Sequence, residues 1–190
     1  GSVRGEPLER AGEGGHGISL VTWLLDAPLL QGIFSRCEPH LPPDFRGGKL
    51  AGINARWRFY RYSPGVVYRP HVDGGWPGSG LAADGTYQYD AYGDRTSRLT
   101  FLVYLNDDFE GGSTTFYSPA PGEPGVLEGR GVSPRQGCVL VFPHGDRTDC
   151  LVHEGSAVRV GYKYVVRTEV LYLHPPSTSG RPPADYIFAT

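Results

Sequence analysis

Short runs of β-branched and aromatic residues, separated by turns, constrain the fold of this chain more than any other feature of its sequence. In residues 54–62 the side chains alternate, which places Trp57 and Phe59 on one face of an extended segment and Arg58 and Tyr60 on the other. Four later runs share this composition and are separated by Gly and Pro residues: 99–105, 112–117, 138–142 and 162–172. Several short strands at this spacing predict a β-sandwich or a β-barrel.

A helix is expected before these strands. Asp26 is a suitable N-cap, and Pro28 would lie in the first helical turn. Apolar residues then recur at helical spacing: Leu29, Leu30, Ile33, Phe34 and Cys37. We expect the Gly- and Glu-rich residues 1–16 to be a flexible lead-in, and the Pro-rich tail 174–190 to wrap the surface or be disordered. One domain is therefore expected over residues 17–173.

The composition and charge of the chain argue against several classes of partner. With 190 residues, 39% of them hydrophobic, the chain can build one domain with a real core. The net charge of −2 gives no broad basic face for nucleic acid or anionic lipid, and no apolar run is long enough to cross a membrane. We expect a soluble protein, with the cytoplasm as the default compartment because no targeting segment is recognisable. The compartment itself and the oligomeric state stay open.

The three cysteines do not predict a metal site. Cys37, Cys138 and Cys150 show no C-x-x-C spacing, and an odd number cannot form a fully paired disulfide framework. A bridge between Cys138 and Cys150 requires that they lie on neighbouring strands. The favoured interpretation is that Cys138 and Cys150 are small buried residues.

The tripeptide His71-Val72-Asp73 is the strongest candidate for a metal site. Residues i and i+2 project from the same face of an extended segment, so the imidazole and the carboxylate can reach one ion. His153 is the best third ligand, because it follows an apolar pair and precedes a long strand-like run. Two histidines and one carboxylate leave coordination positions open, as in non-haem iron(II) oxygenases. Taken alone, an H-x-D motif also suits a structural pair or a zinc site.

Seven segments between residues 54 and 172 form a joint pattern with this motif. They are YRYSPG at 60–65, YRPHVD at 68–73, LTFLVYLN at 99–106, EGGSTTF at 110–116, PRQG at 134–137, HEG at 153–155 and GYK at 161–163. The pattern resembles the prolyl 4-hydroxylase branch of the Fe(II)/2-oxoglutarate-dependent dioxygenases. In that family the distal histidine precedes the co-substrate lysine by ten residues, as His153 precedes Lys163 here.

The resemblance implies a mainly β fold, a double-stranded β-helix or jelly roll flanked by N-terminal helices. It implies that His71, Asp73 and His153 hold Fe(2+) at one mouth of the barrel. By the same resemblance, Lys163 pairs with the distal carboxylate of the co-substrate 2-oxoglutarate, and these four residues are the catalytic set. A buried ammonium needs such an anionic partner. Dioxygen would be the other co-substrate, and ascorbate would support turnover.

Two tyrosines and two arginines are further candidates for the co-substrate site. Tyr62 and Tyr104 match family tyrosines that contact the co-substrate, although each could instead be a core residue with a satisfied hydroxyl. Arg159 and Arg167 are expected on the same terminal strand and face as Lys163 and compete with it as the anchor. The ten-residue spacing selects Lys163.

The resemblance implies hydroxylation of an unactivated C–H bond, and three hypotheses for the function follow. The first is a prolyl 4-hydroxylase-like enzyme acting on a peptide or protein, and the second is a hydroxylase of a free amino acid or small metabolite. The third is an inactive β-helix that only binds a partner. Residues 74–97, rich in Gly, Asp and aromatic side chains, would be either a substrate lid or a packed Ω-loop.

The other histidines are expected at the surface or in turns: His16, His40, His144 and His174. Of these, His144 precedes Gly145-Asp146 in a loop expected near the metal mouth. It is therefore held as a reserve candidate.

Overall fold

The computed structural model describes residues 17–145 and 149–175. The predicted lead-in over 1–16 lies outside this part of the chain, as do residues 176–190 of the predicted tail. The elements are, in order, β1 (Ile18–Leu24), α1 (Ala27–Cys37), a 3-10 turn (Glu38–His40), β2 (Asp44–Phe45), β3 (Gly48–Ile53), β4 (Arg56–Tyr62), β5 (Tyr68–His71), β6 (Gly80–Leu81), β7 (Tyr87–Gln88) and β8 (Arg95–Tyr104). They continue with β9 (Glu110–Gly111), β10 (Thr114–Pro119), β11 (Leu127–Val132), β12 (Val139–Pro143), β13 (Val152–Gly155), β14 (Val158–Val160) and β15 (Lys163–Leu173).

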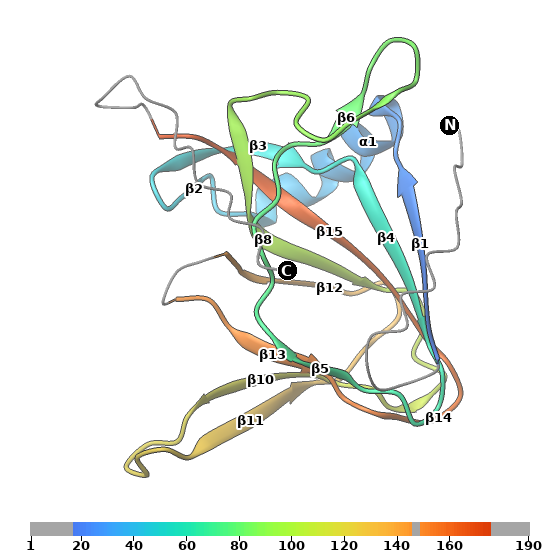
Figure 1. Ribbon diagram of the computed structural model, residues 1–190, viewed down its shortest axis with the longest axis vertical. Coiled ribbons are helices and arrows are strands. Elements are labelled where there is room, and N and C mark those ends of the chain that lie inside the picture. Colours follow the sequence, from blue (N-terminus) through green and yellow to red (C-terminus); the bar gives the residue numbers. More distant parts are fainter. Residues whose placement is uncertain (1–16, 146–148, 176–190) are drawn as a thin grey trace.

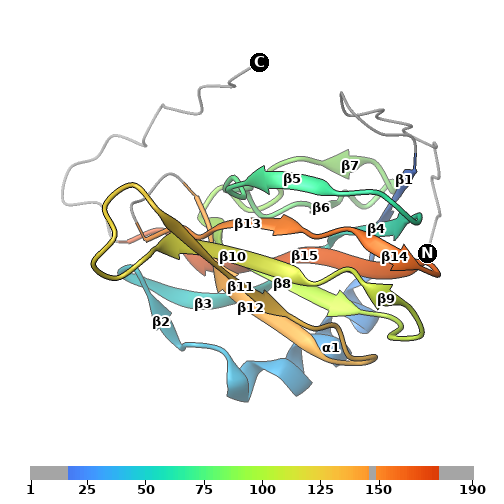
Figure 2. The same cartoon turned by 90° about the horizontal axis from the view of Figure 1, so that it is seen from below.

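Two antiparallel sheets face each other, which is the jelly-roll arrangement that the sequence predicted (Figures 1 and 2). The larger sheet has the order β1-β4-β15-β3-β2, and β8 and β12 continue it from the other edge of β15. The smaller sheet has the order β11-β10-β13-β5. Because β15 pairs with β4, β3 and β8, it lies at the centre of the larger sheet.

The alternation predicted for residues 54–62 appears in β4, whose two faces contribute to different cores. Trp57 belongs to the core between the larger sheet and α1, whereas Tyr60 and Tyr62 belong to the core between the two sheets. Strand β15 alternates in the same way, with Val165 on the inner face and Val166 on the outer one. The inner face of the larger sheet is therefore where functional side chains can meet the smaller sheet.

A single α-helix, α1, is present in the described residues, so the predicted N-terminal helices reduce to this helix and one 3-10 turn. The side chain of Asp26 caps α1 by accepting a hydrogen bond from the Leu29 amide at 3.0 Å, as predicted. The helix covers the outer face of the larger sheet (Figure 2). No helix in residues 17–145 or 149–175 has the length and apolar character needed to cross a membrane.

All three cysteines are free thiols, so Cys138 and Cys150 do not pair. The interpretation of Cys138 and Cys150 as buried residues is wrong for Cys138, which is exposed just before β12, and Cys150 is only partly buried. Burial there depends on which edge of the sheet remains uncovered, and local sequence does not contain that information.

Candidate metal centre

Three predicted ligands meet where the two sheets face each other. His71 ends β5, Asp73 follows two residues later, and His153 of β13 pairs directly with His71 across the smaller sheet. Asp73 Oδ1 lies 3.3 Å from His71 Nε2, and Asp73 Oδ2 lies 3.7 Å from His153 Nε2. One ligand atom from each residue lies within 4.8 Å of the other two, which is a spacing that a single ion can bridge.

Each histidine is held so that the same ring nitrogen is available. His71 Nδ1 lies 2.8 Å from the Arg69 carbonyl oxygen, and His153 Nδ1 lies 3.0 Å from the Leu151 carbonyl oxygen. A carbonyl oxygen can only accept, so each Nδ1 carries the proton and each Nε2 presents a lone pair towards Asp73. Burial also lowers the pKa of His153, which favours the neutral form that binds metals.

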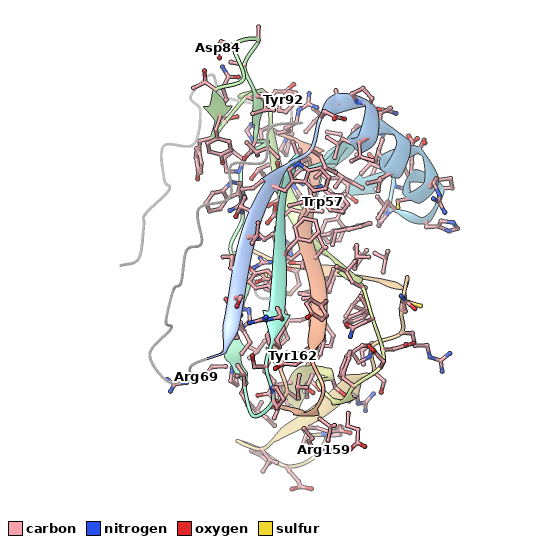
Figure 3. All side chains as sticks on the ribbon, turned by 90° about the vertical axis from the view of Figure 1, so that its right-hand side faces the viewer. Trp57, Arg69, Asp84, Tyr92, Arg159 and Tyr162 are labelled. Carbon is pink, nitrogen blue, oxygen red and sulfur yellow. The ribbon has the colours of Figure 1, made fainter. Side chains whose placement is uncertain are left out.

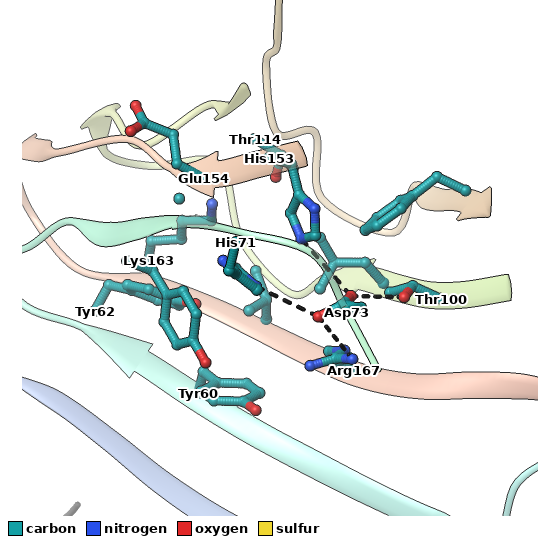
Figure 4. Close-up of a pocket in the computed structure, with 15 residues that line it drawn as sticks. Tyr60, Tyr62, His71, Asp73, Thr100, Thr114, His153, Glu154, Lys163 and Arg167 are labelled. Atoms are coloured by element: carbon teal, nitrogen blue, oxygen red, sulfur yellow. Dashed lines mark hydrogen bonds and ion pairs between the residues drawn. The ribbon is translucent and has the colours of Figure 1, made fainter. Parts of the chain in front are cut away.

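Asp73 is a charged carboxylate whose two oxygens are both positioned (Figure 4). Thr100 donates a hydrogen bond to Oδ2 at 2.6 Å, and the Arg167 guanidinium lies 2.8 Å from Oδ1. Burial alone would raise the pKa of Asp73, but the positive charge of Arg167 and the hydrogen bond from Thr100 oppose this effect. The pKa is therefore below its usual range. An anionic carboxylate beside two imidazole Nε2 atoms fits a divalent iron ion.

His144 is buried and contacts Asp73 indirectly, through the Thr100 hydroxyl, so its interpretation as a surface or turn residue is wrong. It is 1% exposed, and its Nδ1 lies 2.8 Å from the Thr100 hydroxyl that donates to Asp73. Its Nε2 accepts from Ser97 at 2.8 Å. Burial lowers the pKa of His144 to about 4, so the ring is neutral and can donate from one nitrogen and accept at the other. Its place in a loop near the metal mouth was the sequence signal for this role.

Lys163 is a buried cation without a carboxylate partner among the described residues. The whole residue is only 3% exposed, and its Nζ donates a hydrogen bond to the Gly112 carbonyl oxygen at 2.6 Å. Burial lowers the pKa of Lys163 to about 8. The residue lines the same pocket as His71, Asp73 and His153, and Figure 4 shows His71 between it and Asp73. A buried ammonium in such a pocket is suited to an anionic ligand.

The two candidate tyrosines have different environments. Tyr62 lines the pocket, and its ring centroid lies 5.3 Å from Lys163 Nζ. The centroid of Tyr104 lies 5.6 Å from Nζ, but its hydroxyl shares a hydrogen bond with Thr114 at 2.8 Å. Tyr104 is 2% exposed and does not line the pocket, so its placement matches the core alternative.

Of the two competing arginines, only Arg167 lies on the same strand and face as Lys163. Arg159 is in β14 with a side chain 72% exposed, and Glu110 is its ion-pair partner at 4.0 Å. A turn at Gly161, with a φ of 81°, separates β14 from β15 and breaks the strand continuity that the sequence suggested. Arg167 does lie on the inner face of β15, where it contacts Asp73.

Residues 74–97 pack against the larger sheet and do not line the pocket around the metal ligands. Asn54 accepts a hydrogen bond from the Ser79 amide at 3.0 Å, and the Trp76 indole donates to the Ser79 hydroxyl at 3.2 Å. Figure 3 shows Asp84 and Tyr92 of this segment at the opposite end of the molecule from Tyr162. The placement matches the packed Ω-loop alternative for this segment.

Comparison with known proteins gives a consistent result. Residues 57–174 match the family model of the 2OG-Fe(II) oxygenase superfamily. Prolyl 4-hydroxylase 1 of Arabidopsis thaliana is 28% identical over 145 residues, which are 72% of this chain and 46% of that protein. The chain thus spans less than half the length of this curated relative.

Solved structures share the fold at low sequence identity. An oxidoreductase of the 2OG-Fe(II) oxygenase family from Burkholderia pseudomallei superimposes with a TM-score of 0.52 at 16% identity, covering 84% of this chain and 70% of the other. The viral collagen prolyl hydroxylase of Paramecium bursaria Chlorella virus-1 gives a TM-score of 0.50 at 19% identity, covering 83% and 80%.

Proposed function

This chain belongs to the 2OG-Fe(II) oxygenase superfamily, and from that premise we propose that it is a dioxygenase that hydroxylates an unactivated C–H bond. One observation carries the proposal. The three ligand atoms of His71, Asp73 and His153 converge in a pocket that also contains the ammonium of Lys163, which has no carboxylate partner in the part of the chain that the structure describes. A metal site and an anion anchor in one pocket are what a chelating dicarboxylate co-substrate requires.

In the proposed reaction, 2-oxoglutarate supplies the two electrons that the reduction of dioxygen needs beyond those from the substrate. With iron and 2-oxoglutarate bound, the centre supplies the chemistry R–H + 2-oxoglutarate + O2 → R–OH + succinate + CO2. One oxygen atom enters the product and the other enters succinate. His71, Asp73 and His153 would hold Fe(2+), while Lys163, with Tyr62 beside it, would hold the distal carboxylate of 2-oxoglutarate.

The chain's own residues provide geometry and a dry environment for this reaction. The backbone carbonyls at Nδ1 fix both imidazole rings, and Thr100 with Arg167 fixes the Asp73 carboxylate. The ring of Phe142 lies 4.6 Å from that of His153, and this apolar contact limits the access of water to the ligand. Preorganised ligands of this kind need little rearrangement during turnover.

Two substrate classes have support. The prolyl hydroxylases among the relatives favour a prolyl ring, with a peptide or protein as its carrier. The charged side chains inside the barrel favour a small carboxylic acid, such as a free amino acid.

Succinate formation and iron retention in a His153→Ala variant test this proposal. The assay contains iron(II), 2-oxoglutarate and ascorbate, with and without candidate substrates. We expect the variant to lose both iron retention and succinate formation, because one of three ligands is missing. His40→Ala is the matched control, since His40 is exposed in the 3-10 turn. Undiminished succinate formation by the His153 variant would refute the ligand assignment, and so would a wild-type protein that never converts 2-oxoglutarate.

A further inference from the structure

Three arginines line the inner face of the larger sheet beside the metal centre. Arg56 and Arg58 project from β4, and Arg167 projects from β15 directly opposite Arg58 in the strand register. Like charges on directly opposed residues of neighbouring strands repel and are destabilising. This placement therefore needs a compensating interaction.

The carboxylates in contact with these arginines do not balance their charge. Glu169 has a side chain 1% exposed and pairs with both Arg58 and Arg56, the latter at 3.3 Å. Arg167 pairs with Asp73. Three guanidinium groups thus meet two carboxylates, which leaves one positive charge in excess. Binding of Fe(2+) and dianionic 2-oxoglutarate does not remove the excess, because their charges cancel and Lys163 adds a further positive charge to the pocket.

Hydrogen bonding in the cluster is also incomplete. The Nε–H groups of Arg56, Arg58 and Arg167 are buried and have no hydrogen-bond partner among the described residues. The three side chains are only 12–14% exposed, so bulk water does little to compensate them. A buried donor without a partner costs about 1–3 kcal/mol. Three such donors in one place are unusual for a cluster whose role is purely structural.

The cluster lies between the metal pocket and a second cavity. Arg167 lines the metal pocket, whereas Arg56 lines a cavity of about 340 Å³ together with Trp76 and Tyr87. The Arg56 guanidinium lies 3.6 Å from the Trp76 ring centroid, which holds it at the cavity wall. Alternate residues of β4 share one face, so Arg58 lies between Arg56 and the pocket-lining Tyr60.

We infer that the substrate is a small molecule of the amino acid or aliphatic acid class, whose carboxylate binds Arg58 and Arg167. The inference rests on the proposed function and names the substrate class of that site. A carboxylate supplies the one negative charge that the cluster lacks, and guanidinium groups recognise it through paired N–H donors. Since Arg167 contacts Asp73, the rest of such a molecule lies beside the metal centre. An internal prolyl residue of a peptide is flanked by neutral amides and brings no such charge.

Acids and their amides distinguish these substrate classes in the wild-type enzyme. The probes are the twenty free L-amino acids, aliphatic acids of three to six carbons, the corresponding primary amides, and a proline-rich peptide acetylated and amidated at its ends. The readout is succinate formed above the rate without substrate. We expect at least one acid to stimulate succinate formation. The KM for its amide should be at least about tenfold higher, because the amide loses about one charged hydrogen bond. Equal stimulation by acid and amide, stimulation by the blocked peptide alone, or no response to any acid would overturn the inference.

Variants of Arg58 test the position of the carboxylate. Arg58→Gln should raise the KM for the acid at least about tenfold and move the KM for the amide far less, because only the acid uses the charge. A purely structural effect would change both KM values together and would overturn the assignment. Arg58→Lys, which keeps the charge, should recover part of the loss and serves if the glutamine variant does not fold.

The matched control is Arg36→Gln, because Arg36 is exposed on α1. Its KM values should equal those of the wild type. Failure of the inference and failure of the proposed function give different results. A wild-type protein that converts 2-oxoglutarate but ignores every acid refutes only the substrate class, whereas one that never converts 2-oxoglutarate refutes the function itself.

Discussion

Replacing Lys163 with methionine should stabilise the protein in the absence of 2-oxoglutarate. Burial lowers the pKa of Lys163 from its ordinary 10.5 to about 8. At about 1.4 kcal/mol per pH unit, keeping this ammonium charged costs the native state about 3 kcal/mol at neutral pH. Methionine keeps the apolar stem but leaves the Gly112 carbonyl oxygen without its donor, a loss of about 1–2 kcal/mol. The expected net gain is about 1–2 kcal/mol, or about 3–6 °C in Tm.

The gain should depend on pH in a defined direction. Between about pH 8 and 10.5 the native state binds fewer protons at Lys163 than the unfolded state does, so wild-type stability rises with pH over this window. The methionine variant has no such contribution. Its advantage should therefore be complete below pH 8 and should shrink as the pH approaches 10.5.

Urea denaturation of the two proteins between pH 7 and pH 10.5 measures this difference. Lys49→Met is the matched control, because the Lys49 side chain is 73% exposed and its surface ion pair should contribute under about 1 kcal/mol. With metal present, 2-oxoglutarate should stabilise the wild type and the Lys49 variant but not the Lys163 variant. A Lys163→Met protein that is less stable than the wild type at pH 7, or whose advantage is constant with pH, would refute the argument.

Two other substitutions test how Asp73 is held. Arg167→Met should destabilise the metal-free protein by about 3–5 kcal/mol, because the buried Asp73 carboxylate loses its cation. Mn(II) should therefore raise the Tm of this variant more than that of the wild type. Equal shifts in Tm would contradict the ion-pair argument. Thr100→Val keeps the side-chain shape but removes the hydroxyl between Asp73 and His144. It should lower the free energy of unfolding by about 1–3 kcal/mol, measured by denaturation, and should weaken metal binding in a titration. No change in either quantity would show that the hydroxyl is dispensable.

Features that depend on neighbouring residues were predicted well. The alternation in residues 54–62 corresponds to β4, and the runs predicted at 99–105 and 138–142 correspond to β8 and β12. The N-cap at Asp26 is confirmed by its hydrogen bond. Strand alternation and helix caps follow from backbone geometry over a few residues, which a sequence displays directly.

Features that depend on the path of the chain were predicted poorly. Arg159 was expected on the last strand, but a turn at Gly161 separates it from Lys163. His144 was expected in a turn or at the surface, yet the packing of β8 encloses it between Ser97 and Thr100. The loop position of His144 indicated a place near the metal mouth, but its burial could not be predicted locally, because burial is set by the elements that cover a residue.

The sequence by itself determined the pairing of His71 with Asp73, because two residues at spacing i, i+2 on an extended segment share a face. The resemblance to the family then selected His153 and Lys163 by their spacing. Only the tertiary structure decided what surrounds them. It joins Arg58 to Glu169 across 111 positions of the chain, brings Arg167 to Asp73, and leaves the arginines with one charge too many. Strand register between distant segments creates these contacts, and it is settled by the packing of the whole barrel.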